Sequence, residues 1–334
     1  MANAISTSSE LGREEIHRLL LAPSCDELFA RADQIRRASV GETVFVRGIV
    51  EFSNYCARNC LYCGLRRDNR SLRRYRMRMD EIRQAVCALA EAGIGTVILQ
   101  SGDDLSFTRE ALCGLFRDIK RDHPSLAITL SVGERPLDDY RVFREAGADR
   151  YLLKHETASP ELYEKLHPGQ SYDQRMLILR VLRELGYQVG VGCIVGLPWQ
   201  TADDLVSDIL FMKDFQPDMA GIGPFLPQAD TPFNGQPAGS KNLSLRMLAL
   251  ARIVTKNTHL PATTALASLD PVEGLVAGLK AGCNVIMTSA TPDAYRADYK
   301  IYDKRARVTL DVIRSAVAAA GRTMSLERGD SLKK

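Results

Sequence analysis

The chain has 334 residues, of which 45% are hydrophobic and 25% are charged, and its formal net charge at pH 7 is +3. This composition is typical of a globular protein with a large core and excludes a disordered chain, while the mild charge argues against a dedicated nucleic-acid binder. No apolar run is long enough to span a membrane, and the start lacks a basic region followed by an apolar stretch. We therefore expect a cytoplasmic protein without a membrane segment.

The first predicted elements are two short amphipathic helices over residues 11–38, broken at Pro23, so residues 1–40 are assigned to an N-terminal helical cap. After the cap, β-rich segments alternate with helical segments. The β-rich segments are 44–52, 95–100, 126–132, 149–154, 188–195, 218–223, 261–266 and 284–288. The helical segments are 80–92, 108–122, 137–146, 171–185, 202–213, 243–256, 271–281 and 306–320.

This alternation of strands and helices with short connections predicts an α/β fold, a (βα)8 TIM-type barrel over residues 41–320. A doubly wound open sheet is the competing architecture. Residues 321–334 are expected to form a flexible C-terminal tail. In a parallel barrel the active site lies at the C-terminal ends of the strands, so functional residues are expected in the loops that follow them.

Three of the eight cysteines, Cys56, Cys60 and Cys63, lie in the loop after the first predicted strand. In a reducing compartment, clustered thiols indicate metal binding or catalysis. A structural zinc site normally has four protein ligands, and no further Cys or His lies within 20 residues of the trio. A 4Fe-4S cluster held by three cysteines instead leaves one iron open for another ligand. The trio therefore predicts such a cluster, with zinc as the alternative.

The C-x3-C-x2-C spacing, with Tyr62 before the last cysteine, resembles the cluster motif of the radical S-adenosylmethionine (SAM) superfamily. The resemblance implies one 4Fe-4S cluster whose open iron binds SAM. It also implies reductive cleavage of SAM to a 5'-deoxyadenosyl radical, inside a cavity that excludes water. Tyr62 is accordingly counted among the cofactor-binding residues.

Further SAM contacts are expected in the loops after later strands. Gly102 in "LQSGDD" would allow the backbone to approach the methionyl part of SAM, and Gly192 and Ile194 fit the superfamily's adenine-binding G-x-I-x-G pattern. Glu156 is expected to accept hydrogen bonds from the ribose or the amino group of SAM, and Arg175 to pair with its carboxylate. The alternatives are an ordinary turn glycine and a salt-bridge network at the barrel rim.

Longer blocks, among them "EFSNYCARNCLYCGLRRDNRSLRRYRM", "LSVGERP" and "VGLPWQT", are similar to the HydE-type maturases of the FeFe-hydrogenase H-cluster, within the group that includes biotin synthase and methylornithine synthase. This resemblance covers about residues 11–300. It implies an organometallic substrate, a cysteine-bound iron carbonyl cyanide synthon used in diiron subcluster assembly. It also implies a low-potential electron donor, flavodoxin or ferredoxin, and sister hydrogenase maturases as partners.

Small polar residues predicted to face the barrel interior are candidates for binding an anionic, amino-acid-like substrate. They are Ser131, Thr263 and Thr264, with Tyr295 expected to close the mouth. For the threonines, simple β-propensity is the competing explanation. Residues 289–334 contain no cysteine, so a second cluster in the C-terminal part is not expected.

Two other functions stay open: a methylornithine synthase-like or other radical SAM enzyme acting on a small amino-acid-like substrate, and a non-catalytic iron-sulfur scaffold or redox sensor. Residues 66–78 contain seven arginines, which form either a solvated face or a docking site for an acidic electron donor. The rest of the sequence is not expected to extend this patch, since the overall charge nearly balances. Trp199 either crowds the adenine side or covers the barrel mouth.

Overall fold

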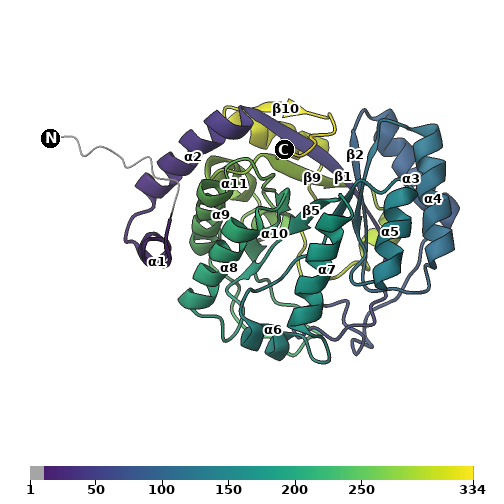
Figure 1. The fold of residues 1–334 in the computed structure, drawn as a ribbon, viewed down its shortest axis with the longest axis horizontal. Helices are drawn as coiled ribbons and strands as arrows, with labels where there is room; N and C mark the ends of the chain where they lie inside the picture. Colours follow the sequence, from purple (N-terminus) through teal and green to yellow (C-terminus); the bar gives the residue numbers. More distant parts are fainter. Residues whose placement is uncertain (1–10, 334) are drawn as a thin grey trace.

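The computed structural model describes residues 11–333 and shows a ring of parallel strands surrounded by helices (Figure 1). The main sheet runs in the order β10-β1-β2-β3-β4-β5-β7, and β9 also pairs with β1. The strands of this sheet are β1 (Thr43–Ser53), β2 (Thr96–Ser101), β3 (Ala127–Ser131), β4 (Arg150–Leu152), β5 (Gln188–Val191), β7 (Met219–Ala220), β9 (Val285–Ser289) and β10 (Thr323–Ser325).

The segment 259–261 closes the ring between β7 and β9. Met219 bridges to His259, and Pro261 bridges to Val285, both in parallel register. The predicted barrel is therefore confirmed, and the open doubly wound sheet is excluded. A separate two-stranded sheet of β6 (Ile194–Val195) and β8 (Gly223–Pro224) extends the fifth and sixth strands beyond the barrel rim.

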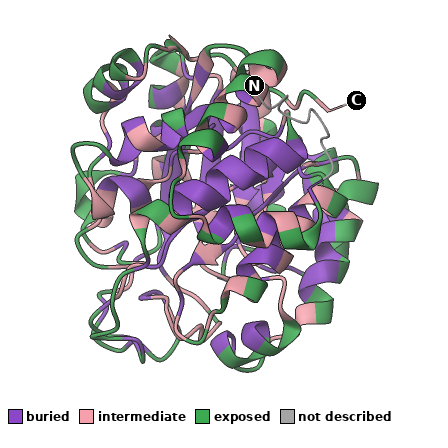
Figure 2. Cartoon of the chain, turned by 90° about the vertical axis from the view of Figure 1, so that its left-hand side faces the viewer, coloured by how far each residue is buried: buried purple, intermediate pink, exposed green. Residues whose placement is uncertain are grey.

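Helices cover the outside of the ring because each buries one apolar face against the strands. Figure 2 shows exposed residues mainly on outer helix faces and loops, with the strands buried. The helices are α3 (Met79–Glu91), α4 (Arg109–Asp122), α5 (Leu137–Glu145), α6 (Pro160–Leu166), α7 (Tyr172–Glu184), α8 (Ala202–Phe215), α9 (Lys241–Thr255), α10 (Thr264–Leu269), α11 (Gly274–Lys280), α12 (Asp293–Arg296) and α13 (Leu310–Ala319). No helix within residues 11–333 has the length and apolarity needed to cross a bilayer.

The two N-terminal helices, α1 (Arg13–Leu21) and α2 (Asp26–Val40), lie on one flank of the barrel. They pack on α8 and α9, which explains why residues 244–255 of α9 are all buried. The first ten residues of the predicted cap lie outside the described part of the chain.

One predicted strand, 261–266, is wrong in its second half because α10 begins at Thr264. The Thr263 hydroxyl accepts a hydrogen bond from the Leu266 amide at 3.4 Å and so caps this helix. A threonine-rich run is compatible with both a strand and a helix N-terminus, since Thr combines β-propensity with N-capping ability.

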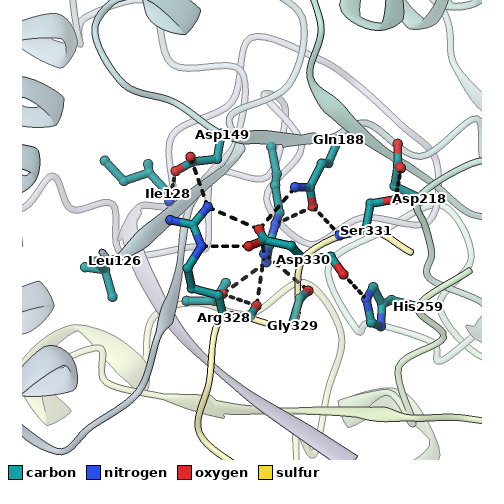
Figure 3. A network of polar contacts seen from close by, with 12 residues as sticks. Leu126, Ile128, Asp149, Gln188, Asp218, His259, Arg328, Gly329, Asp330 and Ser331 are labelled. Atoms are coloured by element: carbon teal, nitrogen blue, oxygen red, sulfur yellow. Dashed lines mark hydrogen bonds and ion pairs between the residues drawn. The ribbon is translucent and has the colours of Figure 1, made fainter. Parts of the chain in front are cut away.

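The C-terminal segment is bound across the N-terminal end of the barrel, where we expected a flexible tail. Its strand β10 pairs with β1, and Figure 3 shows the polar network that follows. The fully buried Arg150 donates hydrogen bonds to the Arg328 carbonyl at 2.9 Å and to Asp330 at 2.8 Å. His259 contacts the Asp330 carbonyl at 2.9 Å. This end of the barrel is therefore closed by the chain itself.

The Asp330 carboxylate is expected to contribute to stability. Burial raises its pKa, but hydrogen bonds from Arg328 and Arg150 outweigh burial and lower the pKa below its usual value. A carboxylate with a lowered folded-state pKa stabilises the fold above its unfolded pKa and loses this contribution as pH falls. Because the side chain is 47% exposed, we expect Asp330→Asn to lower the free energy of unfolding by only about 1 kcal/mol at pH 7.

Urea denaturation of the wild type and the variant at several pH values measures this effect. The difference should shrink below about pH 4, where the unfolded-state carboxyl of the wild type becomes protonated. Asp311→Asn, at an 88% exposed side chain, is the control and should leave the free energy of unfolding nearly unchanged. An equal loss in both variants, or a loss independent of pH, would contradict the assignment.

Candidate functional site

The cysteine-bearing loop follows β1 and lies over the C-terminal end of the barrel. Cys56, Cys60 and Cys63 line the same cavity, which has a volume of about 390 Å³. Other walls of this cavity come from the barrel strands, including Ile98 on β2 and Thr129 on β3. The three thiols therefore line one cavity together with the barrel interior.

Arg74 holds this loop in place from within the basic stretch. Its guanidinium donates hydrogen bonds to the carbonyls of Asn54, Leu65, Arg66 and Asn69, at 2.5, 2.9, 2.7 and 3.1 Å. Carbonyls at a turn need such donors when water is excluded. At least this one of the seven arginines therefore stabilises the loop rather than facing solvent.

The sulfur atoms lie among hydrogen-bond donors. The amides of Arg58 and Asp103 point to Cys56 Sγ at 3.4 Å each, and Gln170 Nε2 donates to Cys60 Sγ at 3.3 Å. Burial raises the pKa of Cys56 to about 11 and that of Cys60 to about 12. Binding of a metal centre must therefore release protons, while the donors stabilise the sulfurs once they carry negative charge.

The spacing of the sulfurs distinguishes between a single metal ion and a cluster. Ligand sulfurs around one zinc ion lie about 3.8 Å apart, given a Zn–S bond of roughly 2.3 Å. In residues 11–333, one group of three ligand atoms lies within 4.8 Å of one another, and it consists of His155, Cys193 and Asp208. The three loop sulfurs do not all lie within this distance of one another, as expected where each sulfur binds its own iron. The donor set therefore fits a cluster better than a mononuclear ion.

Gly102 brings the second strand's loop against the cysteine loop. A Cβ atom at this position would lie 2.6 Å from Cys56 Cβ and would collide with the Tyr55 carbonyl oxygen. Gly102 lines the cavity. The next residue, Asp103, binds the cysteine loop, since its carbonyl accepts a hydrogen bond from Ala57 N at 3.0 Å. We predicted that Gly102 lets the backbone approach SAM. In the structure, the backbone at Gly102 lies close to the cysteine loop.

Glu156 lies in the cavity wall in an unusual backbone conformation. Its φ of 64° is left-handed, which is costly for a residue other than glycine and is common at functional sites. Lys154 Nζ lies 3.1 Å from Glu156 Oε2. Burial raises the pKa of this carboxyl, but the charges of Lys154 and Arg175, with a hydrogen bond from Lys154, outweigh burial and lower it. Glu156 is therefore an anionic hydrogen-bond acceptor at neutral pH.

A buried network supports the strained turn at Glu156. Gly192 N donates to His155 Nδ1 at 3.2 Å, so the other ring nitrogen carries the proton and faces Asp208 Oδ1 at 3.3 Å. Asp208 also accepts a hydrogen bond from Ala158 N at 2.5 Å. The backbone amides of Gly192 and Ala158 bind this group, while His155 Nε2 and Asp208 Oδ2 have no hydrogen-bond partner in the described part of the chain, and we interpret His155, Cys193 and Asp208 as a structural group rather than a metal site.

Arg175 lies in the same cavity and is held by an ion-pair network. It donates to Glu134 at 2.7 Å and to the Lys154 carbonyl at 2.5 Å. Glu134 also accepts from Arg58 at 3.0 Å, and Arg58 donates to Asp103 at 2.6 Å. The rim network that we considered as the alternative is thus present. Two nitrogens of the Arg175 guanidinium, Nε and Nη1, are thus already engaged by Glu134 and the Lys154 carbonyl. This network would have to rearrange before Arg175 could bind a ligand carboxylate through two hydrogen bonds.

Tyr62 is fixed between the cysteines and α6. The His167 Nδ1 atom faces the Tyr163 carbonyl at 2.7 Å, so this nitrogen carries the proton and Nε2 accepts from the Tyr62 hydroxyl at 2.8 Å. Burial lowers the pKa of His167 to about 4, which keeps the ring neutral at pH 7. The tyrosine therefore positions the loop before Cys63.

Other predicted cofactor residues differ in their placement. Ile194 lines the cavity, whereas Gly192 lies behind it. A Cβ atom on Gly192 would collide with the Gly221 carbonyl oxygen, so this glycine allows two strands to approach closely. Trp199 is 59% exposed, packs edge-on against Phe233 and does not line the cavity.

The predicted substrate residues separate into two groups. Ser131, Thr263 and Thr264 line the cavity. Tyr295 does not line it, because its ring stacks on Tyr75 and its hydroxyl donates to Glu81 at 2.9 Å. The tyrosines at the cavity are instead Tyr299 and Tyr302.

Sequence reasoning did not identify the polar groups deeper in the cavity. Arg47 is buried, and its contacts are Met219 Sδ at 2.9 Å and the Gly329 carbonyl at 3.2 Å. No ion pair of Arg47 occurs within the described chain, and neither Arg47 Nε nor Thr129 Oγ1 has a hydrogen-bond partner. The sequence offered one indication of this residue, an arginine within the first predicted strand. Burying a charged side chain costs free energy, so a charge in a buried strand indicates a binding partner.

Comparison with known proteins places this geometry in context. The model of the radical SAM superfamily matches residues 50–212. The chain is 48% identical over 277 residues to the FeFe-hydrogenase maturase subunit HydE of Thermotoga maritima, covering 83% of this chain and 79% of that protein. It is 29% identical over 286 residues to 3-methylornithine synthase of Methanosarcina barkeri, covering 84% and 79%.

Solved structures give a consistent result. A methylornithine synthase structure superimposes with a TM-score of 0.83 at 28% identity, over 95% of this chain and 94% of that one. The maturase HydG from Carboxydothermus hydrogenoformans has the same TM-score at 21% identity, over 95% and 76%. At that identity the second match supports the fold alone.

Proposed function

Because the chain belongs to the radical SAM superfamily, and within it to the family of the FeFe-hydrogenase maturase subunit HydE, we propose that it takes part in H-cluster maturation. It is a radical SAM enzyme, and the cofactors of that superfamily are a 4Fe-4S cluster and SAM. The observation that supports the proposal best is that three cysteines share one barrel cavity with Glu156 and with Arg47, which has no ion pair within residues 11–333.

In the proposed mechanism, Cys56, Cys60 and Cys63 hold the cluster. When bound, the cluster and SAM supply reductive cleavage of the SAM sulfonium. Glu156 would accept hydrogen bonds from the amino group or ribose of SAM, and Ile194, which lines the same cavity, would contact the adenine. The C-terminal segment closes the far end of the barrel and the cysteine loop lies over the near end, so the chain covers both ends of the cavity in which the reaction would occur.

The remaining cavity suits an anionic substrate with an amino-acid part. Arg47 places a positive charge in the wall, and Thr129 offers an unpaired hydroxyl. Ser131 and Thr264 add small polar groups nearer the rim. We assign the cysteine-bound iron carbonyl cyanide synthon to this space, with its carboxylate directed to Arg47, since a buried cation is stabilised best by an anion.

The proposal includes partners and a location. A low-potential donor, flavodoxin or ferredoxin, must deliver the electron, and sister maturases must deliver the substrate and accept the product. All eight cysteines are free thiols, which is expected in the reducing cytoplasm, where we place the protein.

Product analysis tests this function. Anaerobically reconstituted protein with dithionite and SAM is expected to form 5'-deoxyadenosine and methionine, and with the synthon present to convert it into a new iron-containing product detected by mass spectrometry. SAM cleavage without conversion of the synthon, but with conversion of a free amino acid, would favour the methylornithine synthase-like alternative. A cluster without any SAM cleavage would favour the non-catalytic scaffold.

A further inference from the structure

A second cavity of about 400 Å³ lies beside the barrel cavity, and the proposed mechanism does not use it. Its outer wall is the segment 293–308, between β9 and α13. Five cationic side chains line it: Arg296, Lys300, Lys304, Arg305 and Arg307. We call this cavity the cationic antechamber.

Two cations of the antechamber, Lys300 and Lys304, are exposed at its edge and have no acidic partner within residues 11–333. Asp293 forms ion pairs with both Arg296, at 3.0 Å, and Arg307, at 3.7 Å. Arg305 forms an ion pair with the buried Glu51. Within residues 11–333, no ion pair or side-chain hydrogen bond of Lys300 or Lys304 occurs.

The second acidic group of the wall, Asp303, accepts hydrogen bonds from Ala229 N at 2.8 Å and from Gln228 Nε2 at 3.4 Å and keeps its negative charge. The five cations of the lining still outnumber its two carboxylates, Asp293 and Asp303, taken together with Glu51, which pairs with Arg305. The concave surface therefore carries a net positive charge, which attracts anions and concentrates them locally.

The antechamber adjoins the space where the reaction is proposed to occur. Six residues line both cavities: Ile49, Thr264, Met287, Tyr299, Tyr302 and Arg305. The segment also contacts the cysteine loop, since Gly64 N donates to the Ile301 carbonyl at 3.0 Å. A molecule bound in the antechamber would thus contact residues that also line the barrel cavity.

We propose that the cationic antechamber binds a small organic carboxylate, namely the anionic substrate before it enters the barrel. This inference rests on the proposed function, because it assigns the site to that enzyme's amino-acid-like substrate. A concave pocket that shares its lining with the barrel suits a small anion better than it suits a protein surface.

Succinate binding to the reconstituted enzyme provides the direct test, with isothermal titration calorimetry at low and high salt. The double variant Lys300→Gln, Lys304→Gln is expected to bind succinate about tenfold more weakly than the wild type, and high salt should weaken wild-type binding. The matched control removes two exposed charges elsewhere, with Lys280→Gln on α11 and Arg117→Gln on α4. An unchanged dissociation constant in the lysine variant, or an equal loss in the control, would overturn the proposal.

Turnover gives a second, independent readout. With the synthon as substrate, the lysine variant should raise KM several-fold, while dithionite-driven SAM cleavage without substrate stays at the wild-type rate. An unchanged KM would overturn the proposal that the antechamber binds the substrate. A loss confined to reactions driven by flavodoxin or ferredoxin would also overturn it, since the lysines would then serve donor docking. If the wild type cleaves SAM but does not convert the synthon, the proposed function fails, and succinate binding still decides the antechamber.

Discussion

Replacing Cys60 with alanine is expected to abolish the cluster signal of the anaerobically reconstituted protein. Its sulfur lines the main cavity together with Cys56 and Cys63, and Gln170 donates a hydrogen bond to it. Two cysteines cannot replace the three-point attachment of a cluster that already has one open iron. The wild type should contain about four irons per chain. Iron analysis and electron paramagnetic resonance after reduction measure the loss, and SAM cleavage should disappear with it.

The control for this prediction is Cys87→Ala. Cys87 is a half-buried free thiol on α3, and it does not line the cavity. We expect full iron content in this variant. An unchanged spectrum in Cys60→Ala would refute the ligand assignment, and a zinc ion in oxygen-free wild-type protein would refute the cluster.

The Glu156→Ala variant should bind SAM about 10- to 100-fold more weakly while retaining its iron. Hydrogen bonds to a charged acceptor contribute roughly 1.5–3 kcal/mol, and about 1.4 kcal/mol corresponds to a tenfold change in affinity. The carboxylate is anionic and faces the cavity, so its removal takes away an acceptor for the SAM amino group or ribose. Equilibrium binding of SAM to the reconstituted protein measures the effect.

Two further variants separate binding from folding. Glu156→Gln keeps the side-chain volume and one acceptor oxygen, so its affinity should lie between those of the wild type and the alanine variant. Glu164→Ala removes an exposed carboxylate from α6 and should bind SAM normally. Loss of iron in Glu156→Ala would mean that the left-handed turn has a structural role, and unchanged SAM affinity would remove Glu156 from the site.

The predicted strand–helix alternation and the actual barrel agree closely because apolar periodicity reports which face of each element is buried. The cysteine motif was equally local, since its three thiols are separated by only a few residues. The elements that were missed are short: α6, α12 and β10 each have seven or fewer residues. Such elements form through tertiary contacts, as β10 does by pairing with β1.

Local sequence predicted the position of some site residues correctly and of others incorrectly. Ser131, Thr263 and Thr264 were predicted to face the barrel interior and do line the cavity, although Thr263 and Thr264 lie at the start of α10 and not in a strand. Tyr295 was expected to close the mouth and lies elsewhere. Strand register is set by short-range pairing, but a loop side chain takes its direction from whichever surface it packs on. In this case the ring of Tyr75 determines the direction of Tyr295.

By itself, the sequence determined the class of fold, the cysteine motif and the family resemblance, because each depends on residues close together in the chain. Only the tertiary structure decided which charges meet. It paired Arg175 with Glu134, left Arg47 without an ion pair within residues 11–333, and placed Lys300 and Lys304 in a cavity that shares part of its lining with the cysteine-bearing cavity. Electrostatic interaction depends on distance in space and on burial, and residues hundreds of positions apart acquire both only when the barrel closes.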